Sequence, residues 1–355
     1  MDERQRAFLD ELLTTPSPSG FETAGQRVWV DYVDEFADEV RTDDYGNAVA
    51  VVEGDGPELA FAGHADEIGL IVSGIDDDGF LRVGRIGGSD RTVTKGQHVE
   101  VHTDDGVVPG VVGQTAIPLR DDDDDEAEAI DKQHVDVGAG SEEEARELVD
   151  VGDAVTVTQT LDDLAGTRVA ARGMDNRVGT WTAAEALRRA AERDVDATVY
   201  AVSTVQEEVG LKGAKMVGFD LDPDAVVAID VTHAMDSPDV SHDEEFMDLD
   251  VDLGGGPVVA RGSANHPNVV NEVRAAADEA DVPIQLQAAG IRTGTDADAF
   301  YTERGGIPSL NLGLPNRYMH TPAEVVDTDD LDAAADLLAA FAERASGRDG
   351  FGVDL

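Results

Sequence analysis

Two histidines and several carboxylates occur in short segments that lie far apart in the chain. The residues that could bind metal are His64, Asp175, Glu207, Glu208, Asp230 and His320. Imidazole nitrogens and carboxylate oxygens are common ligands of zinc and related divalent cations. Two such cations held side by side mainly catalyse hydrolysis. The residue types therefore indicate a two-metal hydrolase.

Each of these residues also has a simpler interpretation. A lone histidine such as His64 at a strand end is more often a hydrogen-bonded structural residue. Asp175 could serve only as a helix N-cap, which is a common use of aspartate. The pair Glu207 and Glu208 could be solvated surface charge in so acidic a protein. Asp230 closes an apolar run, however, and a carboxylate at that depth should be paired or metal-bound.

Strand and helix patterns suggest how these distant segments could meet. Apolar runs predict strands at 48–52, 59–62, 198–205, 225–231 and 309–313 and an extended segment at 284–288. Helical spacing predicts helices at 2–13, 22–36, 269–280 and 331–345, and another from Asn176 to about residue 192. Strands alternating with helices predict an α/β fold with a mostly parallel sheet flanked by helices. Most of the possible ligands follow predicted strands, where open α/β sheets bind their ligands.

The sequence changes character between residues 73 and 167. Segments 79–83 and 97–102 alternate or nearly alternate between apolar and polar residues, which is typical of antiparallel strands. We therefore expect a β-rich insertion at 73–167 within a discontinuous catalytic domain, 1–72 with 168–355. The run Asp121–Glu128 is almost wholly acidic, and such a block of charge is expected to be a solvated loop.

The charge balance predicts the surroundings of the protein. The 355 residues carry 76 acidic and 26 basic side chains, for a formal net charge of -50. Molar salt would screen this repulsion, so we expect a halophilic microbe with a salt-rich cytoplasm. No cluster of basic residues suits nucleic acid or an anionic membrane. The absence of cysteine excludes disulfides and thiolate ligands, and neither a signal peptide nor a membrane helix is expected.

The chain resembles the tetrahedral (TET) aminopeptidases, a family of di-metal peptidases that also holds glutamyl and deblocking aminopeptidases and proteins labelled endoglucanase M. The resemblance rests on six segments, which follow the order of the family and span nearly the whole chain. These segments are 63–69, 171–177, 205–214, 228–232, 294–297 and 313–322.

The resemblance implies a role for each of the matched residues. Asp175 would bridge two divalent cations, which would be zinc or cobalt, with manganese as an alternative. His64 and Asp230 would complete one coordination shell, and Glu208 and His320 the other. Glu207 would act as general base on a metal-activated water, and Asp66 would orient His64. Thr295 and Asp296 match a segment near the substrate, although a simple turn would explain them equally well.

The leading hypothesis is a cytoplasmic metal-dependent aminopeptidase that removes N-terminal residues from short peptides. The resemblance also implies a large homo-oligomer, a tetrahedral dodecamer, with the insertion acting in assembly or as a lid. The nearest alternative is another two-metal hydrolase, such as a carboxypeptidase or an N-acyl deacylase. A glycosidase, which needs two carboxylates and no metal, and an acidic assembly protein with a decayed site are further alternatives.

Overall fold

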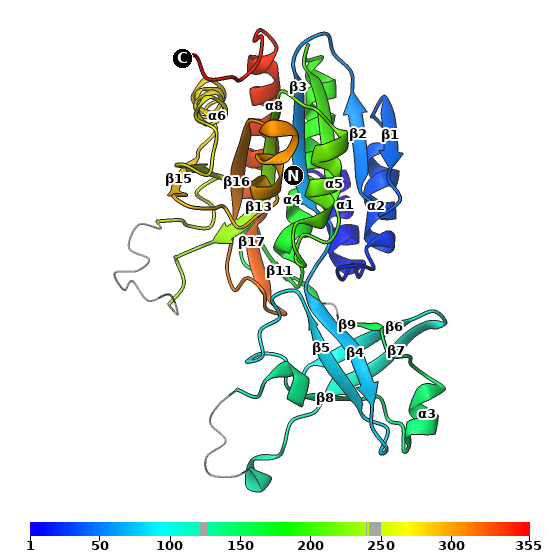
Figure 1. The fold of residues 1–355 in the computed structure, drawn as a ribbon. Coiled ribbons are helices and arrows are strands. Elements are labelled where there is room, and N and C mark those ends of the chain that lie inside the picture. Colours follow the sequence, from blue (N-terminus) through cyan, green and yellow to red (C-terminus); the bar gives the residue numbers. More distant parts are fainter. Residues whose placement is uncertain (121–126, 159, 239, 241–249) are drawn as a thin grey trace.

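An eight-stranded sheet forms the larger part of the molecule (Figure 1). The computed structural model describes residues 1–120, 127–158, 160–238, 240 and 250–355. The strand order is β1 (Glu39–Thr42), β2 (Ala48–Val52), β12 (Thr198–Thr204), β3 (Glu58–His64), β13 (Ala225–His233), β16 (Ser309–Asn316), β14 (Val258–Arg261) and β15 (Gln285–Ala288). The inner strands β12, β3, β13 and β16 pair in parallel, which confirms the predicted α/β fold with a mostly parallel sheet.

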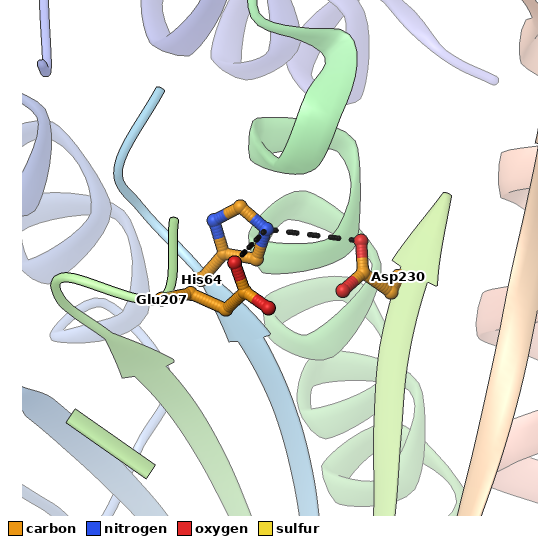
Figure 2. A group of neighbouring side chains, drawn as sticks. All are labelled: His64, Glu207 and Asp230. Carbon is orange, nitrogen blue, oxygen red and sulfur yellow. Dashed lines mark ion pairs between the residues drawn. The ribbon is translucent and has the colours of Figure 1, made fainter. Parts of the chain in front are cut away.

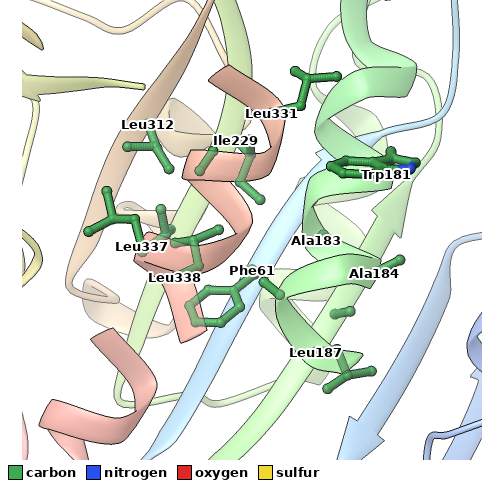
Figure 3. Close-up of a cluster of buried hydrophobic side chains, with 14 of the residues drawn as sticks. Phe61, Trp181, Ala183, Ala184, Leu187, Ile229, Leu312, Leu331, Leu337 and Leu338 are labelled. Atoms are coloured by element: carbon green, nitrogen blue, oxygen red, sulfur yellow. The ribbon is translucent and has the colours of Figure 1, made fainter. Parts of the chain in front are cut away.

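Helices cover both faces of this sheet. One face packs against α1 (Glu3–Thr14), α2 (Thr23–Val33), α4 (Met174–Arg193), α6 (Pro267–Ala280) and α8 (Thr328–Ala345), and the other against α5 (Lys212–Asp220) and α7 (Ala297–Phe300). Side chains alternate along β3, so that Phe61 enters the first core and Ala60 the second. Figure 3 shows Phe61 between α4 and α8, beside Leu338.

A closed barrel of short strands lies below the sheet in Figure 1. Around the barrel the order is β4 (Gly69–Ile75), β5 (Leu81–Ile86), β8 (His134–Asp136), β7 (Gly106–Val112), β6 (His98–Thr103) and β9 (Ala154–Val157). Alternation along β6 buries Val99 and Val101 in the barrel core. The short helix α3 (Glu142–Arg146) contributes Ala145 to the same core.

A small sheet joins the two parts of the fold. Its strands are β10 (Leu161–Asp163), β11 (Arg168–Ala171) and β17 (Glu324–Asp327). Ala171 of β11 pairs with Glu324 of β17, so the segment before α4 lies beside the segment that follows β16. These strands of three or four residues are too short to show a clear pattern, and they were not predicted from the sequence.

Part of the acidic run Asp121–Glu128 lies outside the described residues. The described part includes Glu128, whose carboxylate forms an ion pair with Lys95 at 2.6 Å. Short 3-10 turns occur at Ile117–Leu119, Ile130–Lys132 and Glu303–Gly305. Among the helices of the described ranges, none has the length and hydropathy needed to cross a membrane.

Candidate metal centre

The possible metal ligands gather at the carboxyl ends of the central strands. His64 is the last residue of β3, Asp230 lies near the end of β13, the pair Glu207 and Glu208 follows β12, His320 follows β16, and Asp175 lies in the first turn of α4. A close approach between β3 and α4 makes this possible. A side chain at Gly63 would lie 2.5 Å from the carbonyl carbon of Gly179, so only glycine allows the two elements to meet here.

His64, Glu207 and Asp230 form a first group of ligand atoms (Figure 2). Nε2 of His64 lies 3.7 Å from Oδ1 of Asp230 and 3.9 Å from Oε2 of Glu207. All three side chains are buried. Their ligand atoms all lie within 4.8 Å of one another, a spacing that a single cation could span.

Asp175, Glu208 and His320 form a second group of the same kind. Nε2 of His320 lies 3.1 Å from Oδ2 of Asp175 and 3.4 Å from Oε1 of Glu208. The other oxygen of Asp175, Oδ1, lies 3.2 Å from Nε2 of His64. One carboxylate therefore faces both imidazoles, each through a different oxygen, which is the arrangement of a bridging ligand.

The two groups hold more negative charge than they can compensate. Burial raises the pKa of Glu207 to about 10, and it also raises the pKa values of Glu208 and Asp230. Asp175 differs, because hydrogen bonds from His320 and His64 outweigh its burial and lower its pKa. Carboxylates that are buried without matching cations are costly. Four carboxylates and two imidazoles therefore fit a pair of divalent cations.

Asp66 holds the turn that carries the two glutamates. Its carboxylate accepts hydrogen bonds from the backbone N–H groups of Glu207 at 2.9 Å and Glu208 at 3.2 Å, and from Oγ of Ser19 at 2.6 Å. Nδ1 of His64 lies 3.0 Å from the backbone carbonyl of Asp66 and 3.4 Å from its carboxylate. Asp66 thus contacts His64 and also fixes the Glu207–Glu208 turn.

Glu324 is a positioning residue that the sequence analysis missed. It is fully buried, and its two oxygens accept hydrogen bonds from the backbone N–H of Asp175 at 3.0 Å and of His320 at 2.7 Å. The second of these bonds holds His320 at a φ of 63°, in the left-handed region. The available signal was an acidic residue opening the apolar strand Glu324–Asp327, shortly after His320.

A cleft of about 290 Å³ opens beside the metal ligands. Thr295 lines this cleft together with Thr232, His233 and Arg292. Asp296 lies deeper, where its carboxylate accepts a hydrogen bond from Oγ1 of Thr204 at 2.6 Å. Burial raises the pKa of Asp296 to about 7. The structure therefore brings Thr295 to the cleft but places Asp296 behind it.

Comparisons with known proteins agree with this geometry. Residues 46–337 match the family model described as M42 glutamyl aminopeptidase. The lysyl aminopeptidase of Pyrococcus furiosus is 35% identical over 344 residues, covering 95% of this chain and 96% of that protein.

Solved structures point to the same group of enzymes. A TET aminopeptidase from a marine sediment archaeon of the Thaumarchaeota superposes with a TM-score of 0.90 at 30% identity, covering 96% of each chain. The Pyrococcus horikoshii TET1 peptidase, described as able to assemble into a tetrahedron or a large octahedral shell, gives 0.84 at 32% identity, covering 95% of this chain and 99% of the other. The chain therefore belongs to the M42 aminopeptidase family.

Proposed function

We propose that the protein binds two divalent cations and uses them to remove N-terminal residues from short peptides. The observation that carries this proposal is Asp175, whose two oxygens lie 3.2 Å and 3.1 Å from the imidazoles of His64 and His320. In this proposal Asp175 would contribute to holding both cations. His64 and Asp230 would hold one of them, and Glu208 and His320 would hold the other. The donor set suits zinc or cobalt, with manganese as an alternative.

The reaction would be hydrolysis of the first peptide bond. Bound divalent cations supply Lewis acidity to the attacking water and to the scissile carbonyl. Glu207 would accept the proton of that water on its carboxylate and deliver it to the leaving amine as the C–N bond breaks. Burial alone disfavours the charge of Glu207, and two cations bound beside it would compensate that charge, so the carboxylate would be ionised and able to accept the proton. Thr295, at the wall of the cleft, would contact the substrate, and Asp296 would support that wall.

The test of this function is hydrolysis of aminoacyl-chromophore substrates in molar KCl. We expect activity that chelation removes and that zinc or cobalt restores. Glu207→Gln should lower kcat by about 10²–10⁴-fold while both cations stay bound, because Glu207 is the proposed base and the other five residues of the two groups are the proposed ligands. Glu143→Gln, on the exposed side of α3, is the matched control and should be fully active. Hydrolysis only of peptides with a blocked N-terminus would instead indicate a deacylase.

We also propose that residues 73–167 form an insertion domain that takes part in assembly. The support is the assembly described for the Pyrococcus horikoshii TET1 peptidase, which this chain resembles along 95% of its length. Light scattering coupled to size-exclusion chromatography in molar KCl should give a dodecamer. A monomer at every protein concentration would contradict the proposal.

A salt-rich cytoplasm stays a prediction that rests on the net charge of -50. Self-repulsion of this size weakens as the Debye length falls to about 3 Å in molar salt. Dialysis to low salt is therefore expected to unfold or dissociate the protein, as measured by circular dichroism and light scattering. An unchanged signal after dialysis would refute the high-salt interpretation.

A further inference from the structure

A second cluster of buried charges lies between the barrel and the sheet, and it consists of Glu67, Arg172 and Arg177. Oε2 of Glu67 accepts a hydrogen bond from Nη2 of Arg177 at 2.7 Å and another from Nη1 of Arg172. Its Oε1 accepts the backbone N–H of Ser17 at 2.9 Å. One carboxylate thus serves two guanidinium groups, and the cluster keeps an excess positive charge.

The two arginines differ in how many of their guanidinium N–H groups have a hydrogen-bond acceptor. Arg177 donates to the backbone carbonyls of Gly173, Leu12 and Thr15 in addition to Glu67. Arg172 is only 5% exposed, yet within the described chain neither its Nε nor its Nη2 has a hydrogen-bond acceptor. These two nitrogens lie on one edge of the guanidinium group, where their N–H bonds form a fork that suits an anion.

Arg172 lines a pocket of about 50 Å³ at the boundary between the barrel and the sheet. Much of the wall is apolar and includes Leu70, Val99, Val112, Val155 and Val157 of the barrel. Asp90 also lines the pocket, but its two oxygens accept the backbone N–H and the hydroxyl of Thr92, each at 2.8 Å. Among the described residues, Asp90 therefore gives no hydrogen-bond acceptor to Nε or Nη2 of Arg172.

We propose that this pocket binds a small monovalent anion, chloride, on the Nε–Nη2 edge of Arg172. Buried charges are costly unless they are paired, and the excess positive charge sets the sign of the missing partner. The volume accommodates an ion with a few water-sized neighbours but is far below the roughly 300–1,000 Å³ of a metabolite site. Because Gly173 and His320 line the same pocket, the anion would join the barrel to the segments that carry two metal ligands.

The first test compares thermal unfolding in KCl and in potassium gluconate at equal potassium concentration. Binding to the folded state alone should raise the Tm in chloride by on the order of 5 °C and then level off. Arg172→Met should lose this difference. It should still fold, because Glu67 keeps Arg177 as its partner. Arg168→Met, which alters a more exposed arginine of the adjacent β11, is the matched control and should keep the difference.

The second test is a crystal structure grown in bromide, which replaces chloride and gives an anomalous signal. The proposal expects a peak within hydrogen-bonding distance of Nε and Nη2 of Arg172, absent in Arg172→Met and weaker in Arg172→Lys. Water at this position in the wild type, or chloride effects that are equal in all variants, would overturn it. The wild-type crystal decides the matter even if Arg172→Met fails to fold.

Discussion

Two buried clusters of charge lie close together in this molecule, and they are unbalanced in opposite directions. The metal cluster (His64, Asp175, Glu207, Glu208, Asp230 and His320) gathers four carboxylates around two imidazoles. The arginine cluster (Glu67, Arg172 and Arg177) places two guanidinium groups around one carboxylate. The contrast teaches that the sign of the uncompensated buried charge indicates the kind of ligand. The excess negative charge of the first cluster indicates cations, and the excess positive charge of the second indicates an anion.

The strongest challenge to this comparison is to remove the one carboxylate of the arginine cluster. Glu67→Gln removes the carboxylate that pairs with both buried guanidinium groups and should destabilise the protein by about 3–5 kcal/mol. Glu208→Gln in the metal-free protein should cost far less, because burial already disfavours the charge of Glu208. Denaturant unfolding at fixed KCl measures both. If both variants lost the same free energy of unfolding, the two clusters would not differ in their charge balance.

The next largest effect concerns the bridging position. Asp175→Asn removes the negative charge between the two imidazoles, so both cations should bind more weakly by over about 100-fold, since even residues outside the ligand shell contribute about 10–100-fold. Isothermal titration with zinc and with cobalt gives the two affinities. Asp162→Asn, a change of the same kind at an exposed position of β10, is the control. Loss of only one cation would show that Asp175 does not bridge.

Glu324→Gln tests whether a residue that is not a proposed metal ligand holds the ligands Asp175 and His320 in position. A glutamine cannot accept two backbone N–H groups as the carboxylate does, so one of the bonds to Asp175 and His320 should be lost. We expect metal affinity to fall by about 10–100-fold. Glu303→Gln, at a half-buried position beside α5 and outside the cleft, should have no effect on metal affinity. Wild-type affinity in Glu324→Gln would mean that the ligands hold their positions unaided.

The last comparison, which concerns stability rather than metal binding, uses two neighbouring serines. Ser19 donates to the carboxylate of Asp66, and its replacement by alanine should cost about 1.5–3 kcal/mol, the usual value for a hydrogen bond to a charged group. The hydroxyl of Ser17 has no partner in the described chain, so Ser17→Ala should be nearly neutral. Thermal unfolding of the two variants separates the cases. The reverse order would mean that the Asp66 contact contributes little.

The sequence predicted the features that depend on local pattern. Runs such as 48–52 and 198–205 correspond closely to β2 and β12, because apolar residues of that length can only be buried strands or helix segments. The residues proposed to bind metal could be found for a related reason, since most lie at or after the end of a predicted strand and Asp175 lies at the start of a predicted helix. The helix α5 was missed because Gly213 and Gly218 lower its helix propensity.

Features that depend on contacts between distant segments could not be predicted in this way. Glu324 acts on Asp175 across 149 positions of sequence. Its pattern, a charged residue before two valines, is that of an ordinary strand beginning. The open edge of Arg172 is equally hidden, because it depends on barrel residues that approach from another part of the chain. Only the fold shows which polar atoms lack partners.

The way the barrel is attached has a mechanical consequence. The chain enters the barrel at β4 shortly after His64, and it leaves through β10 and β11 shortly before Asp175 (Figure 1). Both connections therefore carry side chains of the metal cluster. A torque on the barrel from a neighbouring subunit of the proposed assembly would change the separation of His64 and Asp175 before it moved most of the sheet. We expect subunit contacts on the barrel to tune turnover by setting that separation.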